Sequence, residues 1–273
     1  MHELEVTSGG TTLGAEVVGN GSPVLLLHGL TATRRYVTMG SRSLERSGHR
    51  VISYDARGHG VSSPAAQPAA YGYCELVGDA EAVLANCASD RAVLAGASMG
   101  AHTALALTLL NPERVAGLVI ITPGYDPATF SDRLRLQRWD ALAQGLRGGG
   151  VDGFMAAYRT PSVPASQRPA VLTAVRQRLE RHAHPGAVAD ALSAVARSAP
   201  FPDLSALARI AVPCVVVASR DEFDPEHPYA LAAAYAGTIP DAELVSEQPG
   251  RSPLAWQGAQ VSAVIAALAA RCA

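Results

Sequence analysis

Short unbroken apolar runs recur along the chain, and stretches with helical spacing separate them. The runs at 23–29, 91–97 and 115–122 have the length of β-strands, and unbroken apolar character is typical of strands covered on both faces. Residues 3–7 and 12–19 alternate as a β-hairpin does. The same patterns predict further strands at 49–55, 212–219 and 242–248, and helices at 36–48, 73–88, 99–112, 227–237 and 252–271. This alternation indicates an α/β fold with a mostly parallel sheet of about eight strands, flanked by helices.

The alternation is interrupted after Pro123. Residues 124–205 contain no convincing strand, and their apolar residues follow helical spacing in four stretches: 131–146, 151–159, 167–182 and 185–197. We therefore predict a core domain built from 1–123 and 206–273, and a helical cap, or lid, at 124–205, inserted after the sixth strand.

Composition narrows the partners of this 273-residue chain. Hydrophobic residues make up 48% of the chain and charged residues 17%, so the hydrophobic residues suffice to fill a large core. The net charge of −2 gives no excess of positive charge that would bind nucleic acid or an anionic membrane. We expect a small-molecule substrate or ligand. No apolar run of about 18 residues could span a bilayer, and the first residues lack a secretory pattern, so we expect a cytoplasmic protein. The oligomeric state is not readable from the sequence.

The sequence also limits the chemistry. The chain has no lysine, which removes Schiff-base mechanisms, and its four cysteines have no metal-ligand spacing. We expect no metal and no organic cofactor.

The strongest chemical signal is Gly96-Ala97-Ser98-Met99-Gly100, between the strand at 91–97 and the helix at 99–112. In that context G-x-S-x-G is typical of a tight strand-to-helix turn that exposes a nucleophilic serine hydroxyl. Ser98 as a simple helix N-cap is the plainer alternative. We predict the nucleophile.

Four segments in order, LLLHGL (25–30), YDARGHGVSS (54–63), GASMGA (96–101) and ASRDEFDPEHP (218–228), resemble the α/β-hydrolase superfamily. The resemblance covers nearly the whole chain and implies a Ser-His-acid triad. It implies that the backbone N–H groups of Leu30 and Met99 form an oxyanion hole. Asp221, after the strand at 212–219, matches the acid of the triad, and Asp126 occupies the other place where this superfamily can carry its acid.

Five other histidines are weaker candidates for a catalytic role. The resemblance makes His28 and His59 scaffold residues, and His102 is expected to pack at a helix flank, away from Ser98. His182 and His184 belong to the cap and are expected to be solvated.

The chain departs from the family at the position of the base. A histidine usually follows the last strand, where this chain has Arg251, and His227 is the last histidine in the sequence. A guanidinium stays protonated and cannot accept the Ser98 proton. The catalytic set predicted from the sequence is therefore Ser98, Asp221 and, as the most reachable substitute base, His227.

Three interpretations remain open. In the first, another residue such as His227 acts as base on a small ester, lactone or related carbonyl compound. In the second, the fold binds a ligand without hydrolysis, and Arg251 pairs with Asp221 or holds an anionic group. In the third, the oxyanion hole alone supports an undemanding reaction, including cyclase, lyase or isomerase chemistry.

The substrate pocket is expected between the serine turn and the cap. Arg251, Trp139, Phe154 and Tyr158 are its predicted lining residues, with Phe130 as a further apolar candidate. The aromatic residues could instead join the cap helices to the core, and this plainer interpretation is favoured over an aromatic cage for a cation.

Overall fold

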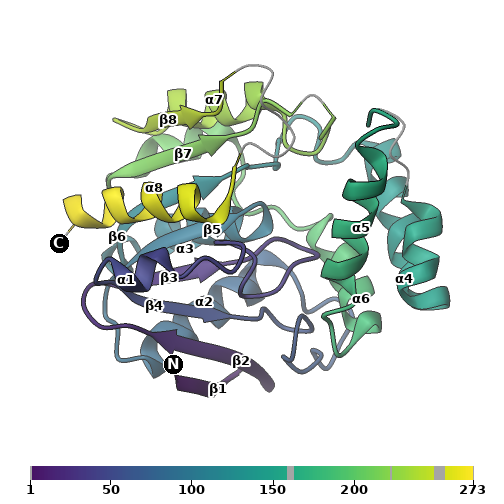
Figure 1. The fold of residues 1–273 in the computed structure, drawn as a ribbon, viewed down its shortest axis with the longest axis horizontal. Coiled ribbons are helices and arrows are strands. Elements are labelled where there is room, and N and C mark those ends of the chain that lie inside the picture. Colours follow the sequence, from purple (N-terminus) through teal and green to yellow (C-terminus); the bar gives the residue numbers. More distant parts are fainter. Residues whose placement is uncertain (1, 159–162, 222, 249–255, 273) are drawn as a thin grey trace.

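The computed structural model describes residues 2–158, 163–221, 223–248 and 256–272. Its strands form one eight-stranded sheet in the order β1-β2-β4-β3-β5-β6-β7-β8 (Figure 1). The strands are β1 (His2–Ser8), β2 (Thr11–Val18), β3 (Pro23–Leu27), β4 (Arg50–Tyr54), β5 (Ala92–Ala97), β6 (Val115–Ile121), β7 (Cys214–Ala218) and β8 (Glu243–Ser246). Strand β2 pairs antiparallel with β1 and β4, whereas all later neighbours are parallel. The predicted fold class and strand positions are confirmed.

Helices cover both faces of the sheet. The α-helices are α1 (Ser43–Arg46), α2 (Tyr73–Asn86), α3 (Met99–Leu110), α4 (Arg133–Ala157), α5 (Arg168–Leu179), α6 (Pro185–Val195), α7 (Tyr229–Thr238) and α8 (Gly258–Arg271), with short 3₁₀ helices at Pro112–Arg114 and Leu204–Arg209. Helices α2, α3 and α7 bury Leu76, Leu105 and Tyr235 in the core on one face. Helices α1 and α8 bury Leu44 and Ile265 in the core on the other.

One predicted helix is mostly wrong. The stretch at 36–48 forms turns, and only Ser43–Arg46 is helical. Arg34 and Arg35, just before it, form ion pairs with Asp55 and Glu16 on other parts of the chain. These tertiary contacts hold the segment in an irregular path that helical spacing alone does not reveal.

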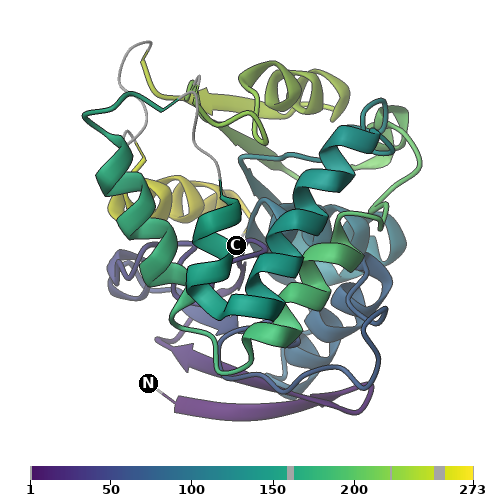
Figure 2. The same cartoon turned by 90° about the vertical axis from the view of Figure 1, so that its right-hand side faces the viewer.

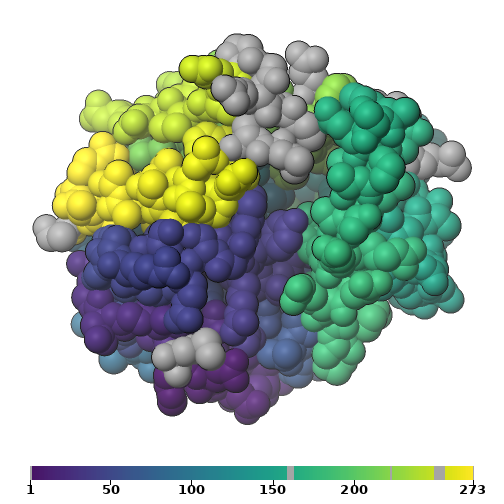
Figure 3. Space-filling model, viewed as in Figure 1, coloured from purple at the N-terminus to yellow at the C-terminus, as the bar shows by residue number. Residues whose placement is uncertain are grey.

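Helices α4, α5 and α6, which we call the inserted helices, follow β6 and precede β7. They lie together at one end of the sheet (Figures 1 and 2) and form one side of the molecule in the space-filling view (Figure 3). Gly149 and Gly150 interrupt α4 with non-helical backbone angles, which matches the predicted break between 131–146 and 151–159. The inserted helices share their own apolar cluster, which Leu30 of the core contacts. Among the described residues, no helix is long and apolar enough to cross a membrane.

Candidate active site

Ser98 lies in the turn between β5 and α3, with φ 50° and ψ −113°. A non-glycine residue at positive φ is strained, and such strain is concentrated at functional sites. The flanking glycines make the turn possible because a Cβ on Gly96 would collide with the carbonyl of Gly100, and one on Gly100 with the carbonyl of Leu27. The motif is therefore explained by close backbone approach on both sides of the serine.

His227 reaches Ser98 from the loop after β7. Its Nε2 lies 2.8 Å from Ser98 Oγ, and its Nδ1 lies 2.8 Å from Asp224 Oδ2. A carboxylate only accepts hydrogen bonds, so Nδ1 carries the proton and Nε2 is left to accept from the serine hydroxyl. The three side chains are thus wired in the order acid, imidazole, hydroxyl.

Asp224 also tunes the imidazole. Burial pulls the pKa of His227 down, but the hydrogen bond and negative charge of Asp224, with that of Glu226, outweigh it and raise the pKa above 6.5. Burial likewise opposes ionisation of Asp224, yet the contact with His227 leaves its pKa below the usual value. The His227 side chain is 22% exposed and the Asp224 side chain 42%, so solvent partly screens the interaction between them.

The loop after β3 lies beside Ser98. A Cβ on Gly29 would come within 3.6 Å of Ser98 Cβ, so the backbone that leads into Leu30 borders the hydroxyl. In the described part of the chain, neither the Leu30 N–H nor the Met99 N–H has a hydrogen-bond acceptor. Two free N–H groups beside a serine could serve a developing oxyanion.

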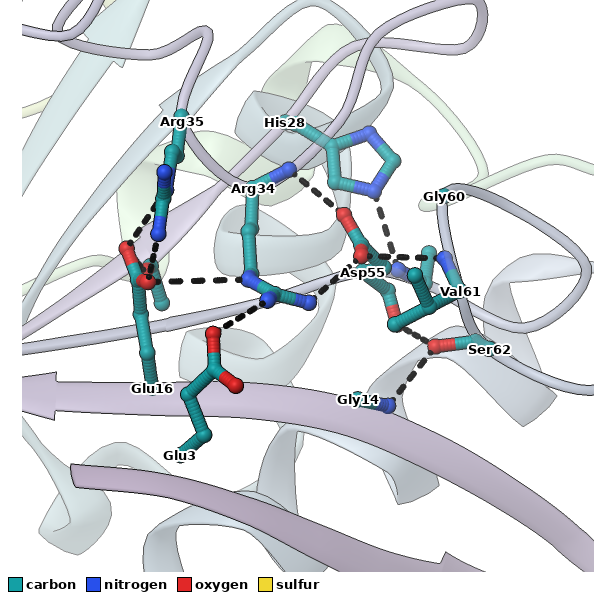
Figure 4. Close-up of polar contacts among 12 residues, drawn as sticks. Glu3, Gly14, Glu16, His28, Arg34, Arg35, Asp55, Gly60, Val61 and Ser62 are labelled. Atoms are coloured by element: carbon teal, nitrogen blue, oxygen red, sulfur yellow. Dashed lines mark hydrogen bonds and ion pairs between the residues drawn. The ribbon is translucent and has the colours of Figure 1, made fainter. Parts of the chain in front are cut away.

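A buried polar network fixes that loop (Figure 4). Asp55 accepts from the backbone N–H of Arg34 at 2.7 Å and pairs with its guanidinium at 2.8 Å. His28 Nε2 accepts from the Ala56 N–H at 2.9 Å, so that ring is neutral and structural, in line with its expected role. His59 places both ring nitrogens at backbone carbonyls, with Nε2 2.6 Å from Leu30 O.

His102 holds the backbone after β6, next to His227. Its Nε2 accepts from the N–H groups of both Gly124 and Tyr125 at 3.0 Å, and its Nδ1 contacts the Tyr73 hydroxyl at 2.9 Å. Burial, with the nearby charge of His227, lowers the pKa of His102 to about 3, so this ring stays neutral. The loop that it holds borders the imidazole, because a Cβ on Gly124 would lie 3.0 Å from His227 Cδ2.

The loop that carries His227 is anchored at its start. Glu247, after β8, accepts from the Arg220 N–H at 2.6 Å and from Ser219 Oγ at 3.0 Å. The Arg220 guanidinium packs over the Tyr229 ring, 4.0 Å from its centroid. Glu226, next to His227, pairs with Arg138 of α4 at 3.2 Å.

The structure corrects the predicted acid. Asp221 does not contact His227 among the described residues; its Oδ1 accepts from the Phe223 N–H at 2.9 Å and shapes the local turn. Asp126 caps the Ala128 N–H in the same way. Asp224 was missed, although the Asp-Pro-Glu-His spacing offered a local signal, because the family pattern directs attention to the residue nearest the strand. Arg251, and with it the proposed pair with Asp221, lies outside the described residues.

The aromatic residues predicted to line a pocket belong largely to the inserted helices' own core. Phe154 is buried and stacks on Tyr158 with ring centroids 5.8 Å apart, while Trp139 packs against the same cluster. This placement supports the plainer interpretation for Phe154, and the half-buried Trp139 and Tyr158 remain predictions. The structure describes no group of three His, Cys, Asp or Glu side chains that could hold a metal ion.

The expected solvation of one cap histidine is wrong. His182 is buried, with Nδ1 accepting from the Gly60 N–H at 2.9 Å and Nε2 donating to Thr31 O at 3.1 Å. It therefore ties the end of α5 to the loop after β3. His184 is exposed, as expected.

Part of the sequence matches a known family model and several curated proteins. Residues 22–148 match a family model described as the alpha/beta hydrolase fold. A candidate carbamate hydrolase, RutD, of Variovorax paradoxus is 37% identical over 114 residues, which cover 42% of this chain and 42% of that protein. The chain thus spans less than half the length of this curated relative.

Solved structures extend the similarity to most of the chain. A thermophilic esterase from Thermogutta terrifontis superposes with a TM-score of 0.73 and 26% identity, covering 90% of both chains. Est816, described as an N-acyl homoserine lactone degrading enzyme, gives a TM-score of 0.71 with 25% identity over 89% of this chain and 91% of its own.

Proposed function

Because the chain belongs to the α/β-hydrolase superfamily, we propose that it is a serine hydrolase of small carboxylic esters or lactones. The observation that carries the proposal is the chain of contacts from Asp224 through His227 to Ser98 Oγ. The names of its relatives, an esterase and a lactone-degrading enzyme among them, support the same reaction class. In this proposal His227, on the loop after β7, takes the place of the histidine that the family usually carries after the last strand.

In the proposed reaction, Ser98 Oγ attacks the carbonyl carbon while His227 Nε2 takes its proton. The N–H groups of Leu30 and Met99 stabilise the oxyanion, and each such donor contributes roughly 3–4 kcal/mol in known enzymes. Collapse of the intermediate expels the alcohol, which receives the proton from His227. Water, deprotonated by the same imidazole, then hydrolyses the acyl-serine to the free acid.

We further propose that the inserted helices cap this site. Leu30 contacts both the core and the inserted helices' apolar cluster, so a substrate at the Leu30 N–H would lie at the boundary between the two. Trp139 and Tyr158 are the half-buried aromatic residues of the cap that remain candidates to border it.

Labelling of Ser98 tests the proposal directly. An activated organophosphonate should label the protein rapidly and stoichiometrically, and 4-nitrophenyl butyrate should be hydrolysed. Ser98→Ala should abolish both activities, and His227→Gln should reduce both by at least about 10³-fold, since no other base contacts Ser98 Oγ among the described residues. Slow labelling that His227→Gln leaves unchanged would show that the imidazole does not activate the serine, and would return the ligand-binding interpretation to first place.

A further inference from the structure

Arg178, near the end of α5, is a half-buried cation without an anionic partner in the described chain. Its Nε is fully buried and has no hydrogen-bond partner. Three other arginines of the inserted helices, Arg138, Arg147 and Arg176, each pair with a carboxylate. Arg135 and Arg168 donate instead to backbone carbonyls. A buried donor left unpaired is costly, so its retention needs an explanation.

The Arg178 guanidinium packs against the loop after β3. Its central carbon is 5.5 Å from the centroid of the Tyr36 ring, on the loop after β3 that also carries Leu30. His182, four residues further on, binds Thr31 O of the same loop and so fixes the end of α5 there.

The charge of Arg178 also reaches the loop that carries His227. Burial and the hydrogen bond between Asp224 and His227 act most strongly on the pKa of both groups, and the charge of Arg178 also lowers both. The cation therefore lies within electrostatic range of the two proposed catalytic groups, Asp224 and His227.

The two described carboxylates next to His227 are already engaged. Asp224 accepts from His227 Nδ1 and, through Oδ1, from the Glu226 N–H at 3.1 Å. The Glu226 side chain pairs with Arg138. An arginine fork matches a carboxylate in a bidentate contact.

We infer that Arg178 binds a carboxylate of the substrate, so that the preferred substrates are esters or lactones that carry a second, free carboxylate. The inference rests on the proposed function, because it places the scissile carbonyl at Ser98 and the anionic group at α5.

A matched pair of ester classes tests the substrate class. The 4-nitrophenyl monoesters of glutarate, adipate and pimelate would be compared with neutral 4-nitrophenyl hexanoate, each corrected for spontaneous hydrolysis. For the wild type we expect the best monoester to exceed the neutral ester in kcat/KM by about tenfold or more. Arg178→Met should remove this preference, mainly through KM, by about 10- to 100-fold. Hydrolysis of the neutral ester should change by less than about threefold.

Two further variants keep the test decisive. Arg178→Lys should restore part of the preference, since it returns the charge but not the fork. Arg181→Met removes an exposed arginine two residues beyond α5 and should change neither ester class. Equal losses on neutral and anionic esters in Arg178→Met, or no preference in the wild type, would overturn the inference while leaving the proposed hydrolase intact.

A binding measurement that needs no turnover tests this inference separately from the proposed hydrolysis. Calorimetry on Ser98→Ala with monomethyl adipate and dimethyl adipate measures recognition even if no ester is hydrolysed. The monoanion should bind about tenfold more tightly, and Arg178→Met in that background should equalise the two. If Ser98→Ala with Arg178 intact binds both compounds equally, the proposed carboxylate site at Arg178 is refuted, whatever the enzyme activity.

Discussion

The assignment of Asp224 rather than Asp221 as the acid can be tested by two matched substitutions. Asp224→Asn keeps the size of the side chain but removes the negative charge that holds the Nδ1 proton of His227. An amide can also turn its NH₂ group toward Nδ1, which favours the tautomer with Nε2 protonated and unable to accept from Ser98.

The size of the effect follows from the exposure of the pair. A hydrogen bond to a charged group contributes about 1.5–3 kcal/mol, which corresponds to roughly 10- to 150-fold in rate. In serine proteases, where the aspartate is buried, the loss is about 10⁴-fold. The Asp224 side chain is 42% exposed, so water can take over part of its role. We therefore expect kcat/KM for 4-nitrophenyl butyrate to fall about 100-fold in Asp224→Asn.

Asp221→Asn is the control, because an asparagine oxygen can still accept the Phe223 N–H and so preserve the turn. It should stay within about threefold of the wild type, and circular dichroism with the thermal midpoint would establish that both variants fold. A larger loss in Asp221→Asn than in Asp224→Asn would refute the assignment and restore the acid expected from the family position.

Two further predictions concern the imidazole. First, kcat/KM should rise with pH to a plateau, and the midpoint of this rise should lie above pH 6.5, because only neutral His227 can act as base and Asp224 raises its pKa. In Asp224→Asn the midpoint should move to lower pH. A midpoint at or below pH 6 in the wild type would contradict the raised pKa of His227. Second, Gly124→Ala should lower kcat by about 10- to 100-fold. Its Cβ would lie 2.5 Å from Glu226 O and 3.0 Å from His227 Cδ2, so the backbone before His227 and the ring must both shift. Gly78→Ala on α2, where a Cβ meets nothing within 4 Å, is the control, and equal kcat in both variants would show that Gly124 does not position the imidazole.

The sheet could be predicted from the sequence because its signal is local. Each parallel strand is covered on both faces, so its residues form an apolar run that ends where the strand ends. The run at 115–122 corresponds to Val115–Ile121, and the run at 91–97 to Ala92–Ala97. The segment at 36–48 failed because its conformation depends on distant ion pairs to Glu16 and Asp55, which spacing within the segment cannot reveal.

The candidate site was only partly predictable for a similar reason. Ser98 could be found from two glycines that the tight turn requires. His227 could be named only because no later histidine exists. Asp224 had a local signal in its spacing from His227, but its contact with Nδ1 depends on the turn from Asp224 to His227. His182 looked like a solvated polar residue of an amphipathic helix, yet its partners, Gly60 and Thr31, lie more than 100 residues away in sequence.

Taking base and acid from one loop changes what the proposed triad depends on. Asp224 and His227 are three residues apart, so their mutual contact is set by a single turn. Only the reach of Nε2 to Ser98, 129 residues away in sequence, requires the tertiary fold. That reach is secured by Glu247 at the start of the loop and by the ion pair between Arg138 and Glu226 beside the imidazole. The second of these contacts comes from α4, so the inserted helices touch the loop that carries the proposed base.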